Sequence, residues 1–346
     1  MRSAERRRRS HPTVRTLLRD AVQRLEAARV SYGHGTLNAR DEAAWLILHA
    51  LKLPLDDLVS RLSREVSSDE AKTVDALIDE RIRTRKPTAY LTREAWLGDH
   101  SFYVDERVIV PRSYIAELLR ERLAPWIAKR SNVGAALDLC TGSGCLAVLT
   151  ALTFPQTRID AADVSRDALD VARRNIRDYG LGRRVRLVRS DLFSALRDRS
   201  YDLIVSNPPY VSAAAMRGLP AEYRSEPAVA LAGGRDGLDF VRRIVTEAPR
   251  HLNPGGLLLV EVGHYRERVE RAFPRLPLVW AQTSGGDDCV FGITREALCS
   301  PSPPRSARAS RAAVSLHPPE ASSPARASGA AAARRRRSAR ASSGSR

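Results

Sequence analysis

The residues from Asn207 to Tyr210 place an amide, two prolines and an aromatic ring directly after an apolar run. The prolines fix their own φ and favour an extended conformation before them, so this segment is predicted to be a rigid loop. The side-chain oxygen of Asn207 and the carbonyl oxygen of Pro208 are two acceptors suited to the two hydrogens of a planar NH2 group. Tyr210 would supply a flat wall. These residues could orient an amide or aromatic amine toward an electrophile; the alternative is a loop that only ends a strand.

A second group of residues, from Asp138 to Gly144, lies where another apolar run meets a predicted helix. Glycines at 142 and 144 allow positive φ and close approach of a ligand to the backbone, and the helix N-terminus offers free N–H groups. The spacing matches neither the phosphate loop nor the complete GxGxxG motif, because Ala147 stands at the third glycine position. Asp138, at the end of the strand, could hold a cation or a ligand amine. The alternative is a simple strand-to-helix turn.

Two further carboxylates follow predicted strands. Asp163 comes about 20 residues after the glycines, where an acid can accept hydrogen bonds from both hydroxyls of a ribose. Asp191 or its neighbouring amide could bind the amino edge of an adenine, with Leu192 or Phe193 against the ring. Each acid alone is more often a helix cap than a ligand. Three acids after three successive strands, beside the glycines, predict a nucleoside-bearing ligand that needs no phosphate.

Strands and helices alternate after residue 134, which is typical of a parallel α/β sheet. Strands are predicted at 135–140, 158–164, 185–191, 201–206 and 257–263, and a closing hairpin within 277–295 is predicted to add an antiparallel strand. Helices are predicted from Cys145 and at 168–179, 240–251 and 265–272. In such a sheet the carboxyl ends of the strands share one edge, which would bring the candidate residues together.

The first part of the chain is predicted to be a small helical bundle. Apolar residues recur at helical spacing between residues 13 and 86, and Asn38 is a candidate cap for a second helix. Ser67 and Glu70 have the spacing of a capping box, and Pro87 is expected to stop that helix. No residue in this region suggests chemistry by itself.

Residues 94–112 change to an alternating pattern that predicts a β-hairpin, with a turn at Gly98-Asp99 and a short β run at 108–110. Ser113 is a candidate N-cap for a helix over 114–123. The hairpin would link the bundle to the sheet.

The charge of the chain is concentrated at its ends. Of the net charge of +17, residues 1–10 carry +4 and residues 300–346 carry +9, so the region between them is only mildly basic. The ends are rich in Arg, Ala, Ser and Pro with few large apolar residues, and they are predicted to be disordered. They could give a weak, salt-sensitive attraction to RNA, or they could be solvated extensions without a specific role.

The bulk composition limits the class of protein. A chain of 346 residues with 43% apolar residues can bury a sizeable core, and no apolar run approaches the ~18 residues of a membrane span. No secretory signal is recognisable. The four cysteines show no CxxC spacing, so we expect reduced thiols in a cytoplasmic protein, without disulfides or a metal site.

The motifs DLCTGSG, Asp163, SDLF and NPPY resemble, in this order, those of a Rossmann-like, class I methyltransferase that uses S-adenosylmethionine. VPRSYIAELL before the first strand and LPAEYRSEPAVALAGGRDGL after NPPY are similar to the HemK-like family of N5-glutamine protein methyltransferases. Members of that family carry an N-terminal helical bundle and a β-hairpin. The resemblance covers residues 13–296.

Within the family, VPRS together with DLCTGSGC is most similar to the branch that methylates the large-subunit ribosomal protein L-three. The release-factor branch typically has PRPETE and DLGTGTG at these places. Tyr114 stands where the ribosomal branch usually has a proline, which leaves nearby substrate contacts open.

The resemblance implies roles for individual residues. The glutamine amide would be held by Asn207, Pro208, Pro209 and Tyr210, with Asn207, Pro208 and Tyr210 as the catalytic residues. The implied cofactor-binding residues are Asp138, Cys140, Thr141, Gly142, Ser143, Gly144, Asp163, Asp191, Leu192 and Asn207.

The expected organisation of the chain follows from the patterns and the resemblance together. It consists of a disordered basic N-terminus (1–12), a helical bundle for substrate recognition (13–90), a β-hairpin linker (91–112), a methyltransferase domain (113–298) and a disordered tail (299–346).

The implied reaction is methyl transfer from S-adenosylmethionine to N5 of a glutamine in ribosomal protein L-three, either as free protein or in a ribosome precursor. Release factors are an alternative substrate. A DNA amino-methyltransferase would need a target-reading region, and the middle of the chain has neither a large insert nor a strongly basic stretch. An RNA-binding module driven by the Arg-rich ends is the alternative from another class.

Overall fold

The computed structural model describes residues 11–124, 126, 127 and 133–300. The predictions of disorder for residues 1–12 and 299–346 therefore fall almost wholly outside the described residues. Within the described part, no helix is both long and apolar enough to cross a membrane.

The N-terminal region is a helical bundle, as predicted. Its helices are α1 (Val14–Ala27), α2 (Ala39–Ala50), α3 (Leu58–Arg61), α4 (Ser68–Thr84) and α5 (Thr88–Thr92). Asn38 accepts a hydrogen bond from the backbone of Asp41, and Ser67 and Glu70 form a capping box, so both predicted caps are confirmed. Helix α4 ends before Pro87, because Arg85 already takes the left-handed conformation.

The predicted hairpin is confirmed as β1 (Ala95–Leu97) and β2 (His100–Phe102), which pair around Gly98-Asp99. The predicted β run at 108–110 is wrong, because these residues are largely buried but pair with no strand. Side chains satisfy their backbone instead: the hydroxyl of Tyr90 donates to the Val108 carbonyl, and the Val110 N–H donates to Glu226 over 2.9 Å.

The helix predicted over 114–123 is shorter than expected. It is α6 (Ile115–Arg120), and it cannot continue to Leu123 because Arg122 and Leu123 have φ angles of +61° and +57°. Ser113 accepts from the Ile115 N–H over 3.2 Å, but the helix cap is Tyr114.

The remaining strands form one sheet of seven in the order β5-β4-β3-β6-β7-β9-β8. They are β3 (Ala135–Leu139), β4 (Arg158–Asp163), β5 (Val185–Arg189), β6 (Tyr201–Ser206), β7 (Leu252–Glu261), β8 (Val279–Trp280) and β9 (Val290–Thr294). The first five are parallel, and β9 pairs antiparallel to β7, which confirms the closing hairpin. This is the Rossmann-like class I methyltransferase sheet with a helical bundle before it.

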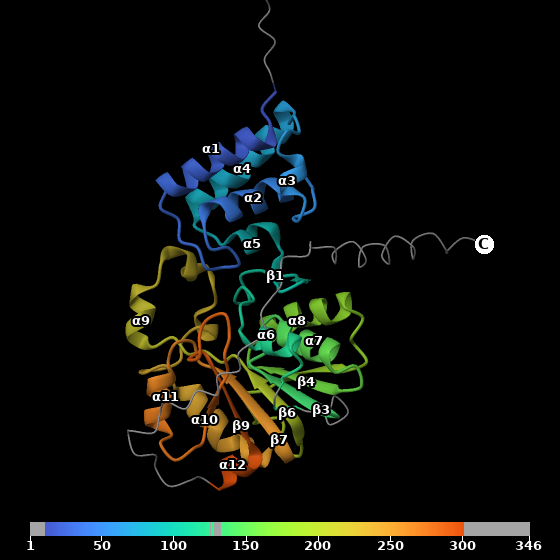
Figure 1. Ribbon diagram of the computed structural model, residues 1–346, viewed down its shortest axis with the longest axis vertical. Helices are drawn as coiled ribbons and strands as arrows, with labels where there is room; N and C mark the ends of the chain where they lie inside the picture. Colours follow the sequence, from blue (N-terminus) through green and yellow to red (C-terminus); the bar gives the residue numbers. More distant parts are fainter. Residues whose placement is uncertain (1–10, 125, 128–132, 301–346) are drawn as a thin grey trace, which may run out of the picture. The chain divides into compact units, whose positions relative to one another are not determined.

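Helices cover both faces of this sheet (Figure 1). One face packs against α6, α7 (Cys145–Thr153) and α8 (Arg166–Asp178). The other packs against α10 (Asp239–Glu247), the short 3-10 helix η4 (Ala248–Arg250), α11 (Arg266–Ala272) and α12 (Arg295–Cys299). Strand residues alternate between the two cores: Leu203 and Val205 join the first, and Ile204 joins the second.

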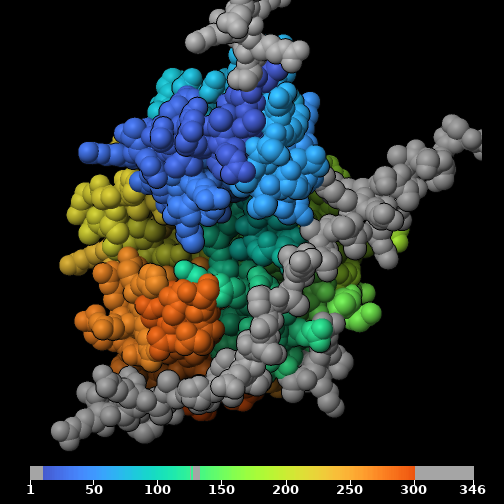
Figure 2. All heavy atoms as spheres, turned by 45° about the horizontal axis from the view of Figure 1, so that its top comes forward, coloured from blue at the N-terminus to red at the C-terminus, as the bar shows by residue number. Residues whose placement is uncertain are grey.

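The segment after β6 contains α9 (Ala213–Gly218) and the short 3-10 helices η2 (Ala221–Ser225) and η3 (Ala228–Ala230). Glu222 in η2 accepts hydrogen bonds from the Ser31 N–H over 3.0 Å and from Arg81, both in the bundle. Figures 1 and 2 accordingly show the yellow segment beside the blue bundle.

The strand order reverses between β3 and β6, since β4 and β5 lie on one side of β3 and β7 lies beyond β6. Ligands of open α/β sheets bind at the carboxyl edge, next to such a reversal. The candidate residues after β3, β4, β5 and β6 all lie at that edge.

Candidate active site

A narrow cavity of about 70 Å³ lies at the carboxyl edge of the sheet. Its lining includes seven of the residues that the sequence predicted: Cys140, Gly142, Asp163, Asp191, Leu192, Asn207 and Pro209. Six other predicted residues are not part of the lining: Asp138, Thr141, Ser143, Gly144, Pro208 and Tyr210. Two further segments also contribute to the walls, with Arg107, Val108 and Ile109 before α6 and with Pro227, Val229 and Ala230 around η3.

The glycine-rich turn combines an opening for a ligand with a close contact between helices. Cys140, Gly142 and Gly144 have φ angles of +62°, +54° and +78°. A Cβ on Gly142 would meet no atom within 4 Å, so this position faces open space. A Cβ on Gly144 would lie 3.0 Å from the Ala172 Cβ, so Gly144 is required for the packing of α7 against α8.

Asp138 is buried beneath the turn rather than at its surface. One carboxylate oxygen accepts from the Thr141 hydroxyl and from the Ala147 N–H at 2.9 Å. Burial raises the pKa of Asp138 to about 7. Its other oxygen has no hydrogen-bond partner among the described residues. Asp138 therefore fixes the shape of the turn, and its direct contact with a ligand stays a prediction.

Asp163 combines exposure to the cavity with a fixed orientation. Its two oxygens accept from the N–H groups of Gly142 and Ser165, each over 2.9 Å. Burial raises its pKa, and these hydrogen bonds oppose the rise. Each carboxylate oxygen has a second lone pair, so acceptor capacity remains for a diol. These acceptors fit the two hydroxyls of the ribose of an adenosyl group.

The adenine-side residues differ in orientation. Leu192 lines the cavity and has a φ angle of +48°, whereas Phe193 is turned into the core and stacks on His251. The carboxylate of Asp191 accepts from Arg243 over 3.0 Å at the surface. Of the two apolar residues that the sequence suggested for the adenine ring, the structure therefore favours Leu192.

The amide of Asn207 is oriented by two acceptors. Its Nδ2 donates to the Arg112 carbonyl oxygen over 3.2 Å and to Glu261 Oε1 over 3.3 Å. Both amide hydrogens are thereby used within the protein, and the Oδ1 atom stays available as an acceptor at the cavity wall.

Tyr210 is held by glycines on several sides. A Cβ on Gly263 would lie 3.0 Å from its ring, and one on Gly233 would lie 2.6 Å from its Cα. Burial raises the pKa of Tyr210, so its phenol stays neutral. Its ring lies edge-on to Tyr265, with 6.4 Å between centroids.

Glu261 is a functional candidate that the sequence analysis missed. It ends β7, is buried, and accepts from the Ser113 hydroxyl, from the Tyr114 N–H over 2.9 Å and from Asn207. Burial raises its pKa to about 7 against the lowering effect of these donors. The signal was available, because Glu261 is a further acid at a strand end.

Arg112 and Glu226 form a second missed feature. Two hydrogen bonds of 2.6 and 2.7 Å join the Arg112 guanidinium to the Glu226 carboxylate, while the Arg112 carbonyl holds Asn207. Burial alone would raise the pKa of Glu226, but Arg112, together with His34, lowers it to about 2. This pair joins the segment after NPPY to the segment before α6. Nothing in the sequence indicated that these two residues would pair.

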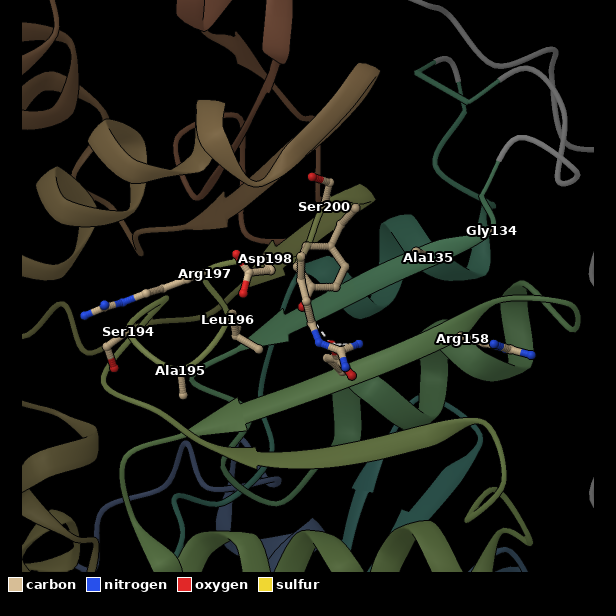
Figure 3. A pocket seen from close by; sticks show the side chains of 12 residues that line it. Gly134, Ala135, Arg158, Ser194, Ala195, Leu196, Arg197, Asp198 and Ser200 are labelled. Atoms are coloured by element: carbon tan, nitrogen blue, oxygen red, sulfur yellow. Dashed lines mark hydrogen bonds and ion pairs between the residues drawn. The ribbon is translucent and has the colours of Figure 1, made fainter.

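A larger cavity of about 680 Å³ lies at the opposite edge of the sheet, beside the first residues of β3, β4 and β6 (Figure 3). Its one buried carboxylate, Asp160, is already paired with Arg186 and with the Tyr201 hydroxyl. Figure 3 shows Arg158 and Arg197 pointing away from each other, so they do not form an anion site together. The smaller cavity is therefore the candidate active site.

Two family models match the chain. The methyltransferase small domain matches residues 117–220, and the PrmC N-terminal domain matches residues 16–92.

Among curated proteins, the chain is 55% identical over 286 residues to a ribosomal protein uL3 glutamine methyltransferase of Bordetella pertussis, covering 83% of this chain and 96% of that protein. It is 54% identical to a protein of the same name from Neisseria meningitidis, with 83% and 94% covered. Among solved structures, the N-terminal domain of human METTL16 in complex with SAH matches with a TM-score of 0.41 at 16% identity, covering 73% of this chain and 93% of that chain.

Proposed function

We propose that this chain, which belongs to the family of ribosomal protein uL3 glutamine methyltransferases, methylates the side-chain amide nitrogen (N5) of a glutamine in ribosomal protein uL3. The methyl donor is S-adenosylmethionine, the cofactor of this enzyme class. When bound, it supplies an electrophilic methyl group. The observation that carries the proposal is the amide of Asn207, whose nitrogen is held by Arg112 and Glu261 while its oxygen is left for a ligand.

The residues of the chain position the substrate amide and the cofactor. Asp163 accepts from the ribose hydroxyls, and Leu192 packs against the adenine. The Asn207 side-chain oxygen and the Pro208 carbonyl accept the two hydrogens of the glutamine amide. An amide nitrogen is a poor nucleophile. The protein can make it react faster mainly in two ways: two acceptors polarise its N–H bonds, and they orient the nitrogen toward the methyl group. Tyr210 does not line the cavity in this structure, so its role as a neutral wall for the substrate amide stays a prediction.

The proton balance needs no basic side chain at the nitrogen. After methyl transfer the nitrogen carries a positive charge and is acidic, so one of its two protons is lost to water. The product is a neutral N-methyl amide. Glu261 contacts Asn207 and does not line the cavity, and its proposed role is therefore to position Asn207.

The proposed division of labour follows the chain. Residues 13–90 recognise the protein substrate, and residues 91–112 link this bundle to the methyltransferase domain. Residues 113–298 bind the cofactor and catalyse the methyl transfer. We also place the reaction in the cytoplasm, during ribosome assembly, with the basic ends adding weak, salt-sensitive contact to RNA.

The test is incubation of the enzyme and methyl-labelled cofactor with purified uL3, a release factor and a DNA duplex in parallel. We expect label on one glutamine of uL3, found by mass analysis, and none on the duplex. Label on the release factor in place of uL3 would overturn the substrate, and label on DNA would overturn the protein-directed reaction. Removing residues 1–10 and 301–346 should leave the methylation of free uL3 intact.

A further inference from the structure

Three potential metal ligands meet beside the candidate active site, on two loops that are distant in sequence. His264 follows the end of β7, and Asp288 and Cys289 directly precede β9. The His264 Nδ1 atom lies 3.0 and 3.1 Å from the two Asp288 oxygens and 3.6 Å from the Cys289 Sγ. The Cys289 Sγ lies 3.4 Å from Asp288 Oδ1. One nitrogen, one oxygen and one sulfur thus form a small triangle.

The dimensions of this triangle match one face of a zinc tetrahedron. With Zn–N and Zn–O bonds of about 2.1 Å and a Zn–S bond of about 2.3 Å, tetrahedral geometry separates nitrogen from oxygen by about 3.4 Å and sulfur from either by about 3.6 Å. With Asp288 Oδ1 as the oxygen ligand, the observed edges are 3.1 Å (N–O), 3.6 Å (N–S) and 3.4 Å (S–O), and they agree with these separations to within about 0.3 Å. Only small side-chain shifts are needed to admit the ion.

A nucleophilic triad and a plain ion pair both fit the cluster less well than a metal site. In a triad the thiol and the carboxylate bind opposite nitrogens of the imidazole, but here both face Nδ1. An ion pair accounts for His264 and Asp288, and the Cys289 Sγ also lies 3.5 Å from the Gly285 carbonyl oxygen, but neither contact requires a thiol where the imidazole and the carboxylate meet. The neighbouring Asp287 is engaged by Arg266 over 2.9 Å and does not compete.

We propose that His264, Asp288 and Cys289 bind one Zn²⁺ ion, with a water molecule in the fourth position. A thiolate, an imidazole and a carboxylate are the ligand types of zinc, whereas Mg²⁺ and Ca²⁺ prefer oxygen alone. As the Zn–S bond forms, the thiol proton is released to solvent. The spacing of the cysteines did not predict this site. Cys289 is its only cysteine, and the fold brings His264 to it from another loop.

The position of the site would let the ion hold two loops together. Gly263, next to His264, lies against the ring of Tyr210, and a Cβ on Gly285 would lie 2.3 Å from the Tyr114 ring. The ion would join the loop after β7 to the loop before β9, which pack against these two rings. Zinc binding itself does not depend on the proposed methyl transfer and can be tested apart from it.

The test is metal titration of the full chain after treatment with a chelator. Zn²⁺ competed against a chromophoric chelator should bind at one equivalent, and Co²⁺ should give the near-ultraviolet absorption of a cobalt–thiolate bond. Cys289→Ser should abolish that absorption and weaken Zn²⁺ binding by about 100-fold or more, since even outer-shell changes cost ~10- to 100-fold. Cys299→Ser, at an exposed cysteine, is the matched control and should bind like the wild type.

His264→Ala is a second variant. It should not disturb the packing of the core, because 67% of that side chain is exposed. It should keep the thermal unfolding midpoint of the metal-free protein and lose at least about tenfold in Zn²⁺ affinity. Equal Zn²⁺ affinity in the wild type, Cys289→Ser and His264→Ala would overturn the proposal, and so would a wild type that gives no thiolate absorption with Co²⁺.

Discussion

At the scale of single residues, the orientation of Asn207 decides whether the pocket accepts or donates hydrogen bonds. Its nitrogen faces the Arg112 carbonyl and Glu261, so the side chain can only accept from a ligand. An amide substrate offers two hydrogens, whereas a carboxylate substrate offers none. With the glutamine bound as proposed, this arrangement would discriminate it from glutamate, whose charged oxygens would meet the Asn207 oxygen.

Asn207→Ala should lower kcat by about 10²- to 10³-fold, the usual effect of removing one hydrogen bond at a reacting group. The affinity for S-adenosylhomocysteine, measured by calorimetry, should change little, because the proposed adenosyl contacts are those of Asp163 and Leu192. Asn38→Ala removes an amide that caps α2 far from the site and serves as the control. Normal turnover in Asn207→Ala would remove this residue from its assigned role.

Glu261 should give the reaction a dependence on pH. Its ionised form accepts from Ser113, Tyr114 and Asn207, and protonation would turn one acceptor into a donor. With a pKa of about 7, kcat/KM is expected to fall as the pH drops below about 7, and to level off above it.

Glu261→Gln should remove that pH-dependent limb and lower kcat/KM by about 10- to 100-fold through misplacement of Asn207. The measurement is a pH profile of kcat/KM for both proteins. Glu267→Gln, at an exposed position of α11, should keep the wild-type profile. A variant profile that still falls below pH 7 would assign the limb to another group.

The site was predictable from sequence where residues follow strands. The apolar runs before Asp163, Asp191 and Asn207 mark strand ends, and parallel strands bring such ends to one edge. The partners of Asn207 were not predictable, because Arg112 and Glu261 reach it from distant segments whose packing no local pattern encodes.

At the scale of elements, local signals predicted most strands and helices, and the failures have physical causes. Strand β7 begins at Leu252, although Pro254 and two glycines suggested a turn there. An irregular register opposite Tyr201 and Leu203 accommodates these residues in the strand. At 108–110, β-branched residues are packed as an irregular segment, because Glu226 and Tyr90 satisfy their backbone.

The Arg112–Glu226 pair should make the free energy of unfolding fall at acidic pH. The pKa of Glu226 is lowered from 4.5 to about 2 in the folded chain, so its contribution is complete above about pH 4.5 and is lost as the pH falls toward 2. Glu226→Gln should lower the free energy of unfolding by about 2–3 kcal/mol at pH 7 and by much less near pH 2.

Denaturant unfolding at pH 7 and near pH 2 measures this difference. Glu106→Gln, which affects ion pairs with Lys86 and Arg93 at the surface, is the control and should cost less than about 1 kcal/mol. A Glu226→Gln deficit of the same size at both pH values would show that packing, and not the ion pair, sets its contribution.

At the scale of the whole molecule, buried charges connect the bundle to the catalytic part. Arg81 lies between Glu42, on α2, and Glu222, in the segment after NPPY, and Arg85 also reaches Glu222. These side chains are buried except for Arg85, so the loss of one partner would leave an uncompensated buried charge. If the bundle recognises the substrate as proposed, these contacts connect it to the loop that follows Asn207–Tyr210.

Glu222→Gln keeps the shape of this contact and removes its charge. We expect the free energy of unfolding to fall by about 2–4 kcal/mol, because Arg81 loses one of its two carboxylates in a buried place. If the bundle holds uL3, the KM for uL3 should rise by about tenfold with little change in cofactor affinity, while Glu80→Gln on the exposed side of α4 changes neither. Limited proteolysis reports whether the bundle has loosened. A loosened bundle with an unchanged KM for uL3 would contradict a role of residues 13–90 in recognition, because the catalytic part alone would then bind the substrate.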